Sequence, residues 1–117
     1  MANAKYKVKG NDKIKGYDSE LEIEVDDKYE AFSKDIPAPM NYQGMTITWF
    51  NNFGVREKSN GKEANITYTV KLKKLPKGKR LFTFYDNQVH ELEPKYLSKD
   101  RVKFTLSVGD PPTGMAP

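Results

Sequence analysis

The clearest structural signal in this sequence is the stretch Ser59-Asn60-Gly61-Lys62-Glu63-Ala64-Asn65-Ile66-Thr67-Tyr68-Thr69-Val70-Lys71-Leu72. Asn-Gly between two extended runs predicts a tight hairpin, because both central residues of a type I′ turn need a positive φ. After the turn, apolar and polar residues alternate with a period of two, as in a strand with one buried face. The stretch therefore predicts a turn followed by a half-buried strand over residues 63–72.

The residues that follow predict an antiparallel meander in the C-terminal half. Leu75-Pro76-Lys77-Gly78 interrupts the pattern, and the alternation resumes at residue 80 until Asp86-Asn87 predicts another turn. Residues 101–108 again alternate strictly. Consecutive strands joined by such turns are typical of antiparallel sheets.

Shorter alternating runs fill most of the N-terminal half. Pro37-Ala38-Pro39 predicts an extended crossover between two sheets, and residues 51–54 predict a turn or bulge. We expect strands over residues 5–9, 19–26, 45–51, 55–59, 63–72, 80–86, 88–93 and 101–108. Seven or eight short strands predict an all-β, two-layer antiparallel β-sandwich of immunoglobulin-like type, with a barrel as the alternative.

Composition narrows the function classes. A chain of 117 residues forms one domain, which we expect over residues 1–110. The absence of cysteine and the single His90 exclude nearly all zinc, thiol and iron–sulfur chemistry. No motif places a serine and an aspartate with His90 as a catalytic triad. We therefore expect no enzyme, no cofactor and no metal, and no apolar run is long enough to span a membrane.

A lysine-rich first strand is expected at a sheet edge. Lys5, Lys7 and Lys9 alternate with Tyr6 and Val8, which form a small apolar face, and Lys13 and Lys15 follow. The next strand, residues 19–26, is acidic on its outer face. Opposite charges on neighbouring strands form weak cross-strand pairs that help to select the register. A calcium site on the acidic strand is disfavoured, because alternate strand residues lie in a line and do not surround an ion.

A second lysine cluster extends from Lys71 to Arg80. A solvated face or a protected edge is the favoured interpretation, although the net charge of +4 also permits an anionic partner. In the alternative of single-stranded nucleic-acid binding, Phe82, Phe84 and Tyr85 near Lys79 and Arg80 supply stacking platforms.

A carbohydrate-binding module is a further alternative and requires an exposed row of aromatic side chains. The candidate residues for such a platform are Tyr42, Trp49, Phe50 and Tyr85. A single tryptophan in an alternating apolar run is more often buried, so we expect Trp49 at the centre of the core.

The C-terminal residues 111–117 predict an extended arm that projects from the domain. Pro111 and Pro112 lack the N–H that a sheet ladder needs, and Pro111 biases Asp110 away from helix. Met115 is the only sizeable apolar anchor in the arm. We expect deletion of residues 111–117 to change the free energy of unfolding by less than about 1 kcal/mol.

The region from Ile36 to Gly114 resembles the choice-of-anchor U type of domain from bacterial surface and secreted proteins. The resemblance rests on Ile36-Pro37-Ala38-Pro39 with Tyr42 and Gly44 before a strand, on Leu75-Pro76-Lys77-Gly78 and Phe84-Tyr85-Asp86, and on a basic strand that ends in Gly109-Asp110. It implies an extracellular, non-enzymatic module of a surface protein or appendage. A leader peptide is then absent from this chain, and Met1 is either native or a cloning start.

The sequence thus favours a structural or interaction module that works through sheet edges and extended termini. Residues 1–4 and 110–117 are expected to reach a neighbouring protein, either another copy or a different surface subunit. The candidate interaction residues are Lys5, Lys7, Lys9, Asp110, Pro111, Pro112 and Met115. Nucleic acid is a less favoured partner than protein, and a cytoplasmic location is not excluded.

Overall fold

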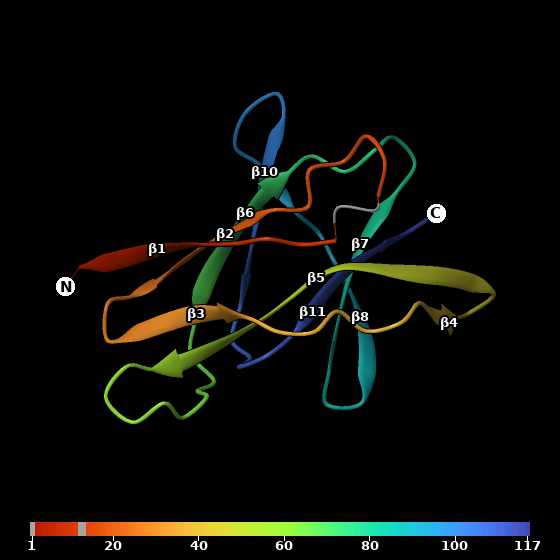
Figure 1. Cartoon of the computed structure of the whole chain (residues 1–117). Helices are drawn as coiled ribbons and strands as arrows, with labels where there is room; N and C mark the ends of the chain where they lie inside the picture. Colours follow the sequence, from red (N-terminus) through yellow and green to blue (C-terminus); the bar gives the residue numbers. More distant parts are fainter. Residues whose placement is uncertain (1, 12–13) are drawn as a thin grey trace.

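The computed structural model describes residues 2–11 and 14–117 and shows two antiparallel sheets packed face to face (Figure 1). Predictions for Met1 and Lys13 lie outside the described residues. The predicted two-layer antiparallel β-sandwich is confirmed, although the described residues form eleven strands instead of seven or eight.

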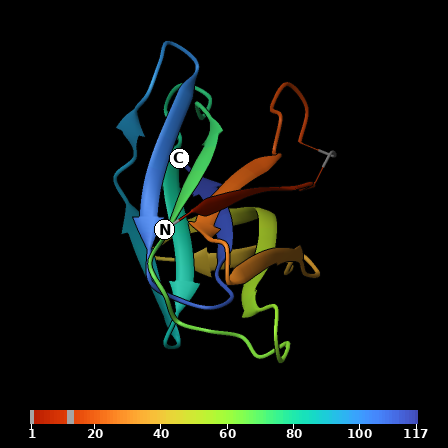
Figure 2. The same ribbon diagram turned by 90° about the vertical axis from the view of Figure 1, so that its left-hand side faces the viewer.

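The strands belong to two sheets, and the chain crosses between these sheets several times. They are β1 (Asn3–Val8), β2 (Leu21–Asp26), β3 (Tyr29–Ser33), β4 (Met40–Tyr42), β5 (Met45–Glu57), β6 (Tyr68–Lys73), β7 (Arg80–Tyr85), β8 (Gln88–Leu92), β9 (Lys95–Tyr96), β10 (Arg101–Leu106) and β11 (Pro112–Ala116). The first sheet has the order β1-β2-β6-β10-β9 and the second β3-β5-β11-β7-β8, with β4 paired to β5. Figure 2 shows β8 and β9 following one another along one side of the molecule.

The main core lies between the sheets and is built by the alternating residues that the sequence places on one face. Ile23, Val70 and Leu72 have no exposed surface. Asn51 is also fully buried, and its Nδ2 donates hydrogen bonds to the carbonyl oxygens of Val8 and Ser19 at 3.0 and 2.8 Å. This amide therefore joins the long strand β5 to the chain at both ends of the β1–β2 connection.

A second, smaller core covers the outer face of the six-stranded sheet. It contains Ile47, Trp49, Phe82 and Ala116, with partly buried residues from the segment 36–42 packed against them. Trp49 is buried, as predicted, but it lies in this smaller core and not at the centre of the main one. Because this sheet has apolar residues on both faces, its central strands do not show the alternation of a half-buried strand.

The predicted type I′ hairpin at Asn60-Gly61 is wrong. Only Gly61 has a positive φ, at 71°, and the loop is closed by bonds from the Gly61 N–H to Glu57 O and from the Glu57 N–H to Lys62 O, both 2.9 Å. Beyond a single bridge between Arg56 and Glu63, the chain crosses to the other sheet, and the next strand begins at Tyr68. The loop therefore connects the two sheets and is not the turn of a hairpin between two paired strands.

The predicted C-terminal meander and the break at residues 51–54 are also wrong. Strand β6 pairs with β2 and β10, whereas β7 and β8 form a hairpin in the other sheet. This hairpin turns at Asp86-Asn87, where both φ values are positive, as the sequence predicts. Residues 51–54 continue β5 because β11 and β3 pair with them.

The C-terminal segment does not project, so the prediction of a free arm over residues 111–117 is wrong. Strand β11 lies in the middle of the six-stranded sheet, between β5 and β7. Residues 111–116 are all buried. Gly114 fits there because it is small: a Cβ atom at this position would lie 2.5 Å from Cε3 of Trp49.

Candidate functional site

The lysines of the first strand lie at a sheet edge, as predicted. The β1–β2 register places Lys5 opposite Glu24 and Lys7 opposite Glu22. A hydrogen bond from Asn3 and the charges of Lys71 and Lys5 hold the pKa of Glu24 below its usual value. The edge is flanked by β3, because the hydroxyl of Tyr6 donates to Tyr29 O at 3.1 Å. Lys9 follows the strand and is exposed.

The predicted aromatic platform does not exist, because its members point in different directions. Trp49 is 3% exposed and Phe50 is fully buried in the other core. Tyr42 packs edge-on against Phe82, and the ring of Tyr85 stacks on His90 with 3.9 Å between centroids. These four aromatic residues therefore form no common sugar-binding surface.

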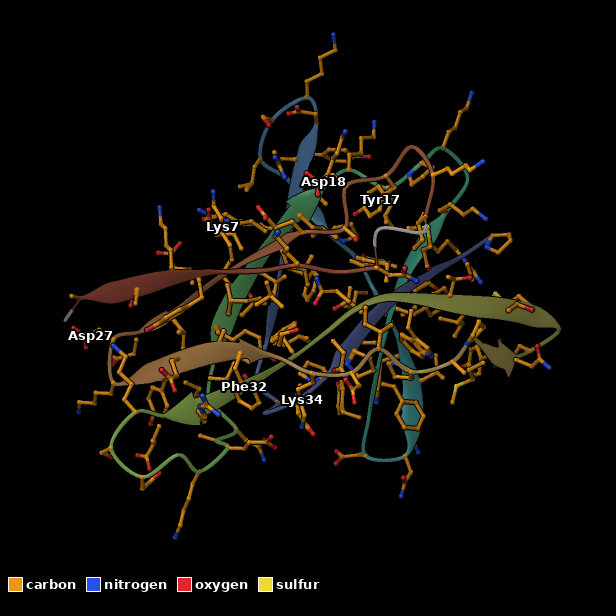
Figure 3. The ribbon with its side chains drawn as sticks, viewed as in Figure 1. Lys7, Tyr17, Asp18, Asp27, Phe32 and Lys34 are labelled. Carbon is orange, nitrogen blue, oxygen red and sulfur yellow. The ribbon has the colours of Figure 1, made fainter. Side chains whose placement is uncertain are left out.

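The residues proposed for a C-terminal interaction arm are committed to the domain itself. The carboxylate of Asp110 pairs with Nζ of Lys34 at 2.9 Å, and Lys34 also pairs with Glu63 at 2.9 Å. Burial by itself would lower the pKa of Lys34, but the hydrogen bonds to Glu63 and Asp110 outweigh it and raise that pKa. Figure 3 shows Lys34 beside Phe32, at the end of β3. Pro111, Pro112 and Met115 are buried.

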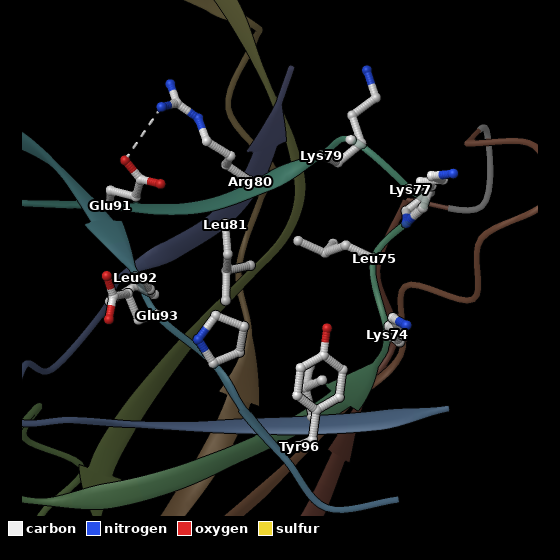
Figure 4. A pocket seen from close by; sticks show the side chains of 14 residues that line it. Lys74, Leu75, Lys77, Lys79, Arg80, Leu81, Glu91, Leu92, Glu93 and Tyr96 are labelled. Atoms are coloured by element: carbon white, nitrogen blue, oxygen red, sulfur yellow. Dashed lines mark ion pairs between the residues drawn. The ribbon is translucent and has the colours of Figure 1, made fainter. Parts of the chain in front are cut away.

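A large hollow lies on the other side of the molecule, where β8 and β9 form the sheet edges. Its volume is about 630 Å³, and we call it the cationic groove. It is lined by residues of the β6–β7 loop and of the chain from β8 to β10: Lys74 to Leu81, Glu91 to Pro94, Tyr96 and Val102. In Figure 4, Leu75, Leu81 and Tyr96 point into it, and Lys77 and Lys79 stand at its rim.

Local sequence explains the shape of the β6–β7 loop. Gly78 has a φ of 83°, which favours glycine, and the N–H of Lys79 bonds to Pro76 O at 3.1 Å, closing a tight turn. The N–H of Lys74 bonds to Asp100 O at 2.8 Å and ties the start of the loop to the first sheet. Leu75 packs against the main core and forms part of the groove floor. The loop is therefore anchored at its base, and its lysines are left in solvent.

The groove is polarised, with positive charge on the loop side and negative charge on the β8 side. Lys74, Lys77, Lys79 and Arg80 supply the cations, and Glu91 and Glu93 supply the carboxylates. Arg80 Nη1 lies 3.6 Å from the Glu91 carboxylate, the pair drawn in Figure 4. Nζ of Lys74 lies 5.2 Å from the centroid of the Tyr96 ring, which is 68% exposed. Positive charge therefore exceeds negative charge along the groove.

Strand β8 presents an open backbone edge beside this groove. Asp86-Asn87 forms a two-residue turn, so Tyr85 and Gln88 form a hydrogen-bonded pair, and every second pair along the hairpin is hydrogen-bonded in the same way. The N–H and C=O groups of Val89 and Glu91, which lie between these pairs, therefore point away from β7. A smaller hollow of about 360 Å³ shares Glu91, Leu92 and Glu93 with the groove and continues to Lys103, Phe104 and Thr105 of β10. Two hollows thus meet at the end of the open edge.

The sequence indicates only half of this site. The lysine cluster is evident in the sequence, but no sequence pattern marks Tyr96, Glu91 or Glu93 as site residues. Phe82, which the sequence suggests as a stacking residue, is 1% exposed. Across the described residues, no three histidine or acidic side chains come close enough to hold a metal ion, and no helix is long and apolar enough to cross a membrane. The groove is formed where the edges of the two sheets, β8 and β9, lie beside the β6–β7 loop, and periodicity does not reveal to which sheet each strand belongs.

Comparison with known proteins adds no relationship: no family model, no curated protein and no solved structure matches this chain. The resemblance to choice-of-anchor U domains therefore stays a prediction.

Proposed function

We propose that the protein is a non-enzymatic interaction module that binds an extended segment of a partner protein along the β8 edge. The observation that carries the proposal is that the open β8 edge, formed by the outward-facing backbone groups of Val89 and Glu91, leads at Glu91 into a hollow with an apolar floor. An extended segment adds to such an edge through main-chain hydrogen bonds, and pockets for alternate side chains give specificity.

The groove defines the chemistry of this segment. Leu75, Leu81 and Leu92 favour apolar side chains at alternate positions. The lysines of the loop favour carboxylates on the side of the segment that faces them, because Glu91 on the opposite wall already has Arg80 as a partner. A segment that alternates apolar and acidic residues fits both features.

The wider setting belongs to the same proposal. The resemblance to choice-of-anchor U domains supports an extracellular surface protein or appendage subunit. Because β11 is buried in its own sheet, the C-terminal segment is not available to a partner, and we assign the interaction to the β8 edge instead.

The proposal is tested with a fluorescein-labelled heptapeptide of alternating valine and glutamate, followed by fluorescence anisotropy. We expect saturable binding that Glu91→Pro weakens at least about tenfold, because proline removes the outward N–H without removing a β7 bond. Glu91→Ala is the matched control, since it loses the same carboxylate and ion pair but keeps the N–H. Tyr96→Ala gives a second, independent reduction without touching the backbone of β8.

Three results would contradict the proposal. One is equal affinity of the proline and alanine variants. Another is equal binding of a peptide that alternates valine and lysine. The third is a single-stranded oligonucleotide that binds the groove more tightly than the acidic peptide, which assigns the site to the nucleic-acid alternative.

A further inference from the structure

A second group of cations, none of which lines the cationic groove itself, lies on the outer face of the five-stranded sheet. The sheet register aligns Lys7, Glu22, Lys71, Lys103 and Lys95 in a single row across all five strands. The next row places Lys73 opposite Arg101. The charge along the first row is positive, negative, then positive three times, so the half of the face formed by β6, β10 and β9 is cationic.

Like charges face each other directly in this half. The N–H of Lys74 bonds to Asp100 O, which makes Lys71↔Lys103 and Lys73↔Arg101 non-hydrogen-bonded pairs, the positions where side chains approach most closely. Like charges at such positions are destabilising. Lys71 is compensated by Glu22 and Glu24 at 3.8 and 3.5 Å.

The remaining four cations have no such compensation. In the part of the chain that the structure describes, no ion pair within 4 Å involves Lys73, Lys95, Arg101 or Lys103. We call these four residues the cationic face. A stable protein that retains two directly opposed pairs of like charge is expected to use them, because binding sites commonly retain locally unfavourable arrangements.

The polar groups beside the cationic face indicate the kind of anion. Thr69 lies opposite Thr105, and the hydroxyls of Thr67 and Ser107 are 2.9 Å apart, so a ladder of hydroxyl groups continues the two strands. None of the described strands of this sheet places an aromatic residue at an outward position. Bases of single-stranded nucleic acid need such stacking platforms, whereas a glycan chain can be held by charges and hydroxyl groups.

The face is also hollowed enough to seat a chain. Two shallow hollows, of about 260 and 430 Å³, share Lys71 and the exposed side chain of Leu97. Glu20 and Glu22 line the first and Glu24 lines the second, so carboxylates form one wall. Anionic groups are therefore directed toward β10 and β9, where Arg101, Lys103 and Lys95 lie.

From these observations we propose that the cationic face binds a linear anionic polysaccharide, whose carboxylate or sulfate groups lie between the opposed cations of β6 and β10. Lys95 and Lys103 also line the smaller hollow that adjoins the groove, but the cationic face lies on the outer face of the sheet and does not depend on the function proposed for the groove. Binding relieves the like-charge repulsion that the folded protein otherwise retains.

The test measures binding of fluorescein-labelled dextran sulfate and alginate, with neutral dextran as the uncharged control. The variant Arg101→Gln/Lys103→Gln removes one member of each opposed pair, and Lys77→Gln/Lys79→Gln removes the same charge from the rim of the groove. We expect the first variant to weaken binding at least about tenfold and to reduce the slope of log affinity against log salt by about two, and the second to have a much smaller effect. Preference for one probe tells sulfate from carboxylate.

The melting temperature of each variant shows whether a loss of binding comes from unfolding. Arg101→Gln/Lys103→Gln is expected to melt at the same or a higher temperature, because it removes unfavourable pairs, so lost binding cannot be attributed to unfolding. Equal weakening by the two double variants would show that only net charge attracts the polymer and would overturn the proposal. Tighter binding of an oligothymidylate of matched charge would overturn the choice of a glycan.

Discussion

The edge strands on the two sides of this sandwich differ in how they are covered: β1 on one side, and β8 and β9 on the other. On one side, the edge strand β1 is flanked by β3, to which the Tyr6 hydroxyl bonds, and its lysines face glutamates of β2. On the other side, β8 and the two-residue strand β9 leave a groove of about 630 Å³ with an exposed tyrosine. Edge strands commonly carry lysines or neighbouring cover that prevent unwanted pairing. The difference indicates that β1 is a protected edge and that β8 lacks such cover, which is why we propose β8 as the edge that a partner uses.

The largest expected effect comes from deleting residues 111–117, because among the described strands β11 alone joins β7 and β8 to the rest of their sheet. The deletion removes the ladders to β5 and β7 and the buried side chain of Met115. The loss should equal most of the roughly 5–15 kcal/mol that stabilises a domain, so no cooperative thermal transition should remain in circular dichroism. A truncated protein that melts within a few degrees of the parent would show that the open side does not need β11.

Alkaline pH should destabilise the core that both sides share. Burial raises the pKa of Tyr17 and of Tyr68, whose hydroxyls each donate to a backbone carbonyl at 2.7 Å. A raised folded-state pKa contributes stability that is complete below the unfolded pKa of about 10 and is lost as the pH rises above it. Urea denaturation should therefore give constant stability from pH 7 to about 9 and a decline above about 10.

The variant Tyr68→Phe serves as a control for this titration. It should be less stable at neutral pH by about 1 kcal/mol, because it loses one hydrogen bond, and it should lose less stability in alkali. An unchanged alkaline decline in both Tyr68→Phe and Tyr17→Phe would assign the effect to other groups.

The smallest effects separate the closed side from the open side. Tyr6→Phe removes the hydroxyl that bonds to Tyr29 O and should reduce stability by about 0.5–1.5 kcal/mol. Tyr96→Phe, at the exposed ring of the groove, should change it by less than about 0.5 kcal/mol. The two substitutions are chemically identical, so chemical denaturation compares the two sides directly. Equal losses would mean that the groove side is as tightly packed as the β1 side.

Strands with one buried face were predictable from the sequence, and strands with two buried faces were not. The alternation of β2, β6 and β10 matches their burial residue by residue. Strand β11 has the sequence Pro-Thr-Gly-Met-Ala, and all five residues are buried. The close contact between Gly114 and Trp49 requires a small residue in this strand. In the sequence, small residues together with proline instead predict an irregular tail, so the strand is missed.

The candidate site was only partly predictable for a related reason. The lysines from Lys71 to Arg80 form one cluster in the sequence, but Lys71 and Lys73 lie on the outer face of β6, whereas Lys77 and Lys79 lie at the groove. Which charges act together depends on register and on crossings between sheets. The pairing of Lys73 with Arg101 is an example that no local pattern reveals.

The most direct test of the β8 edge is amide hydrogen exchange at single residues, with and without the alternating valine–glutamate peptide. The N–H groups of Val89 and Glu91 face outward from β8, and those of Lys5 and Lys7 face outward from β1. Saturating peptide should slow exchange at Val89 and Glu91 and leave Lys5 and Lys7 unchanged. Protection at Lys5 and Lys7 with none at Val89 and Glu91 would contradict the assignment of β8 as the interacting edge.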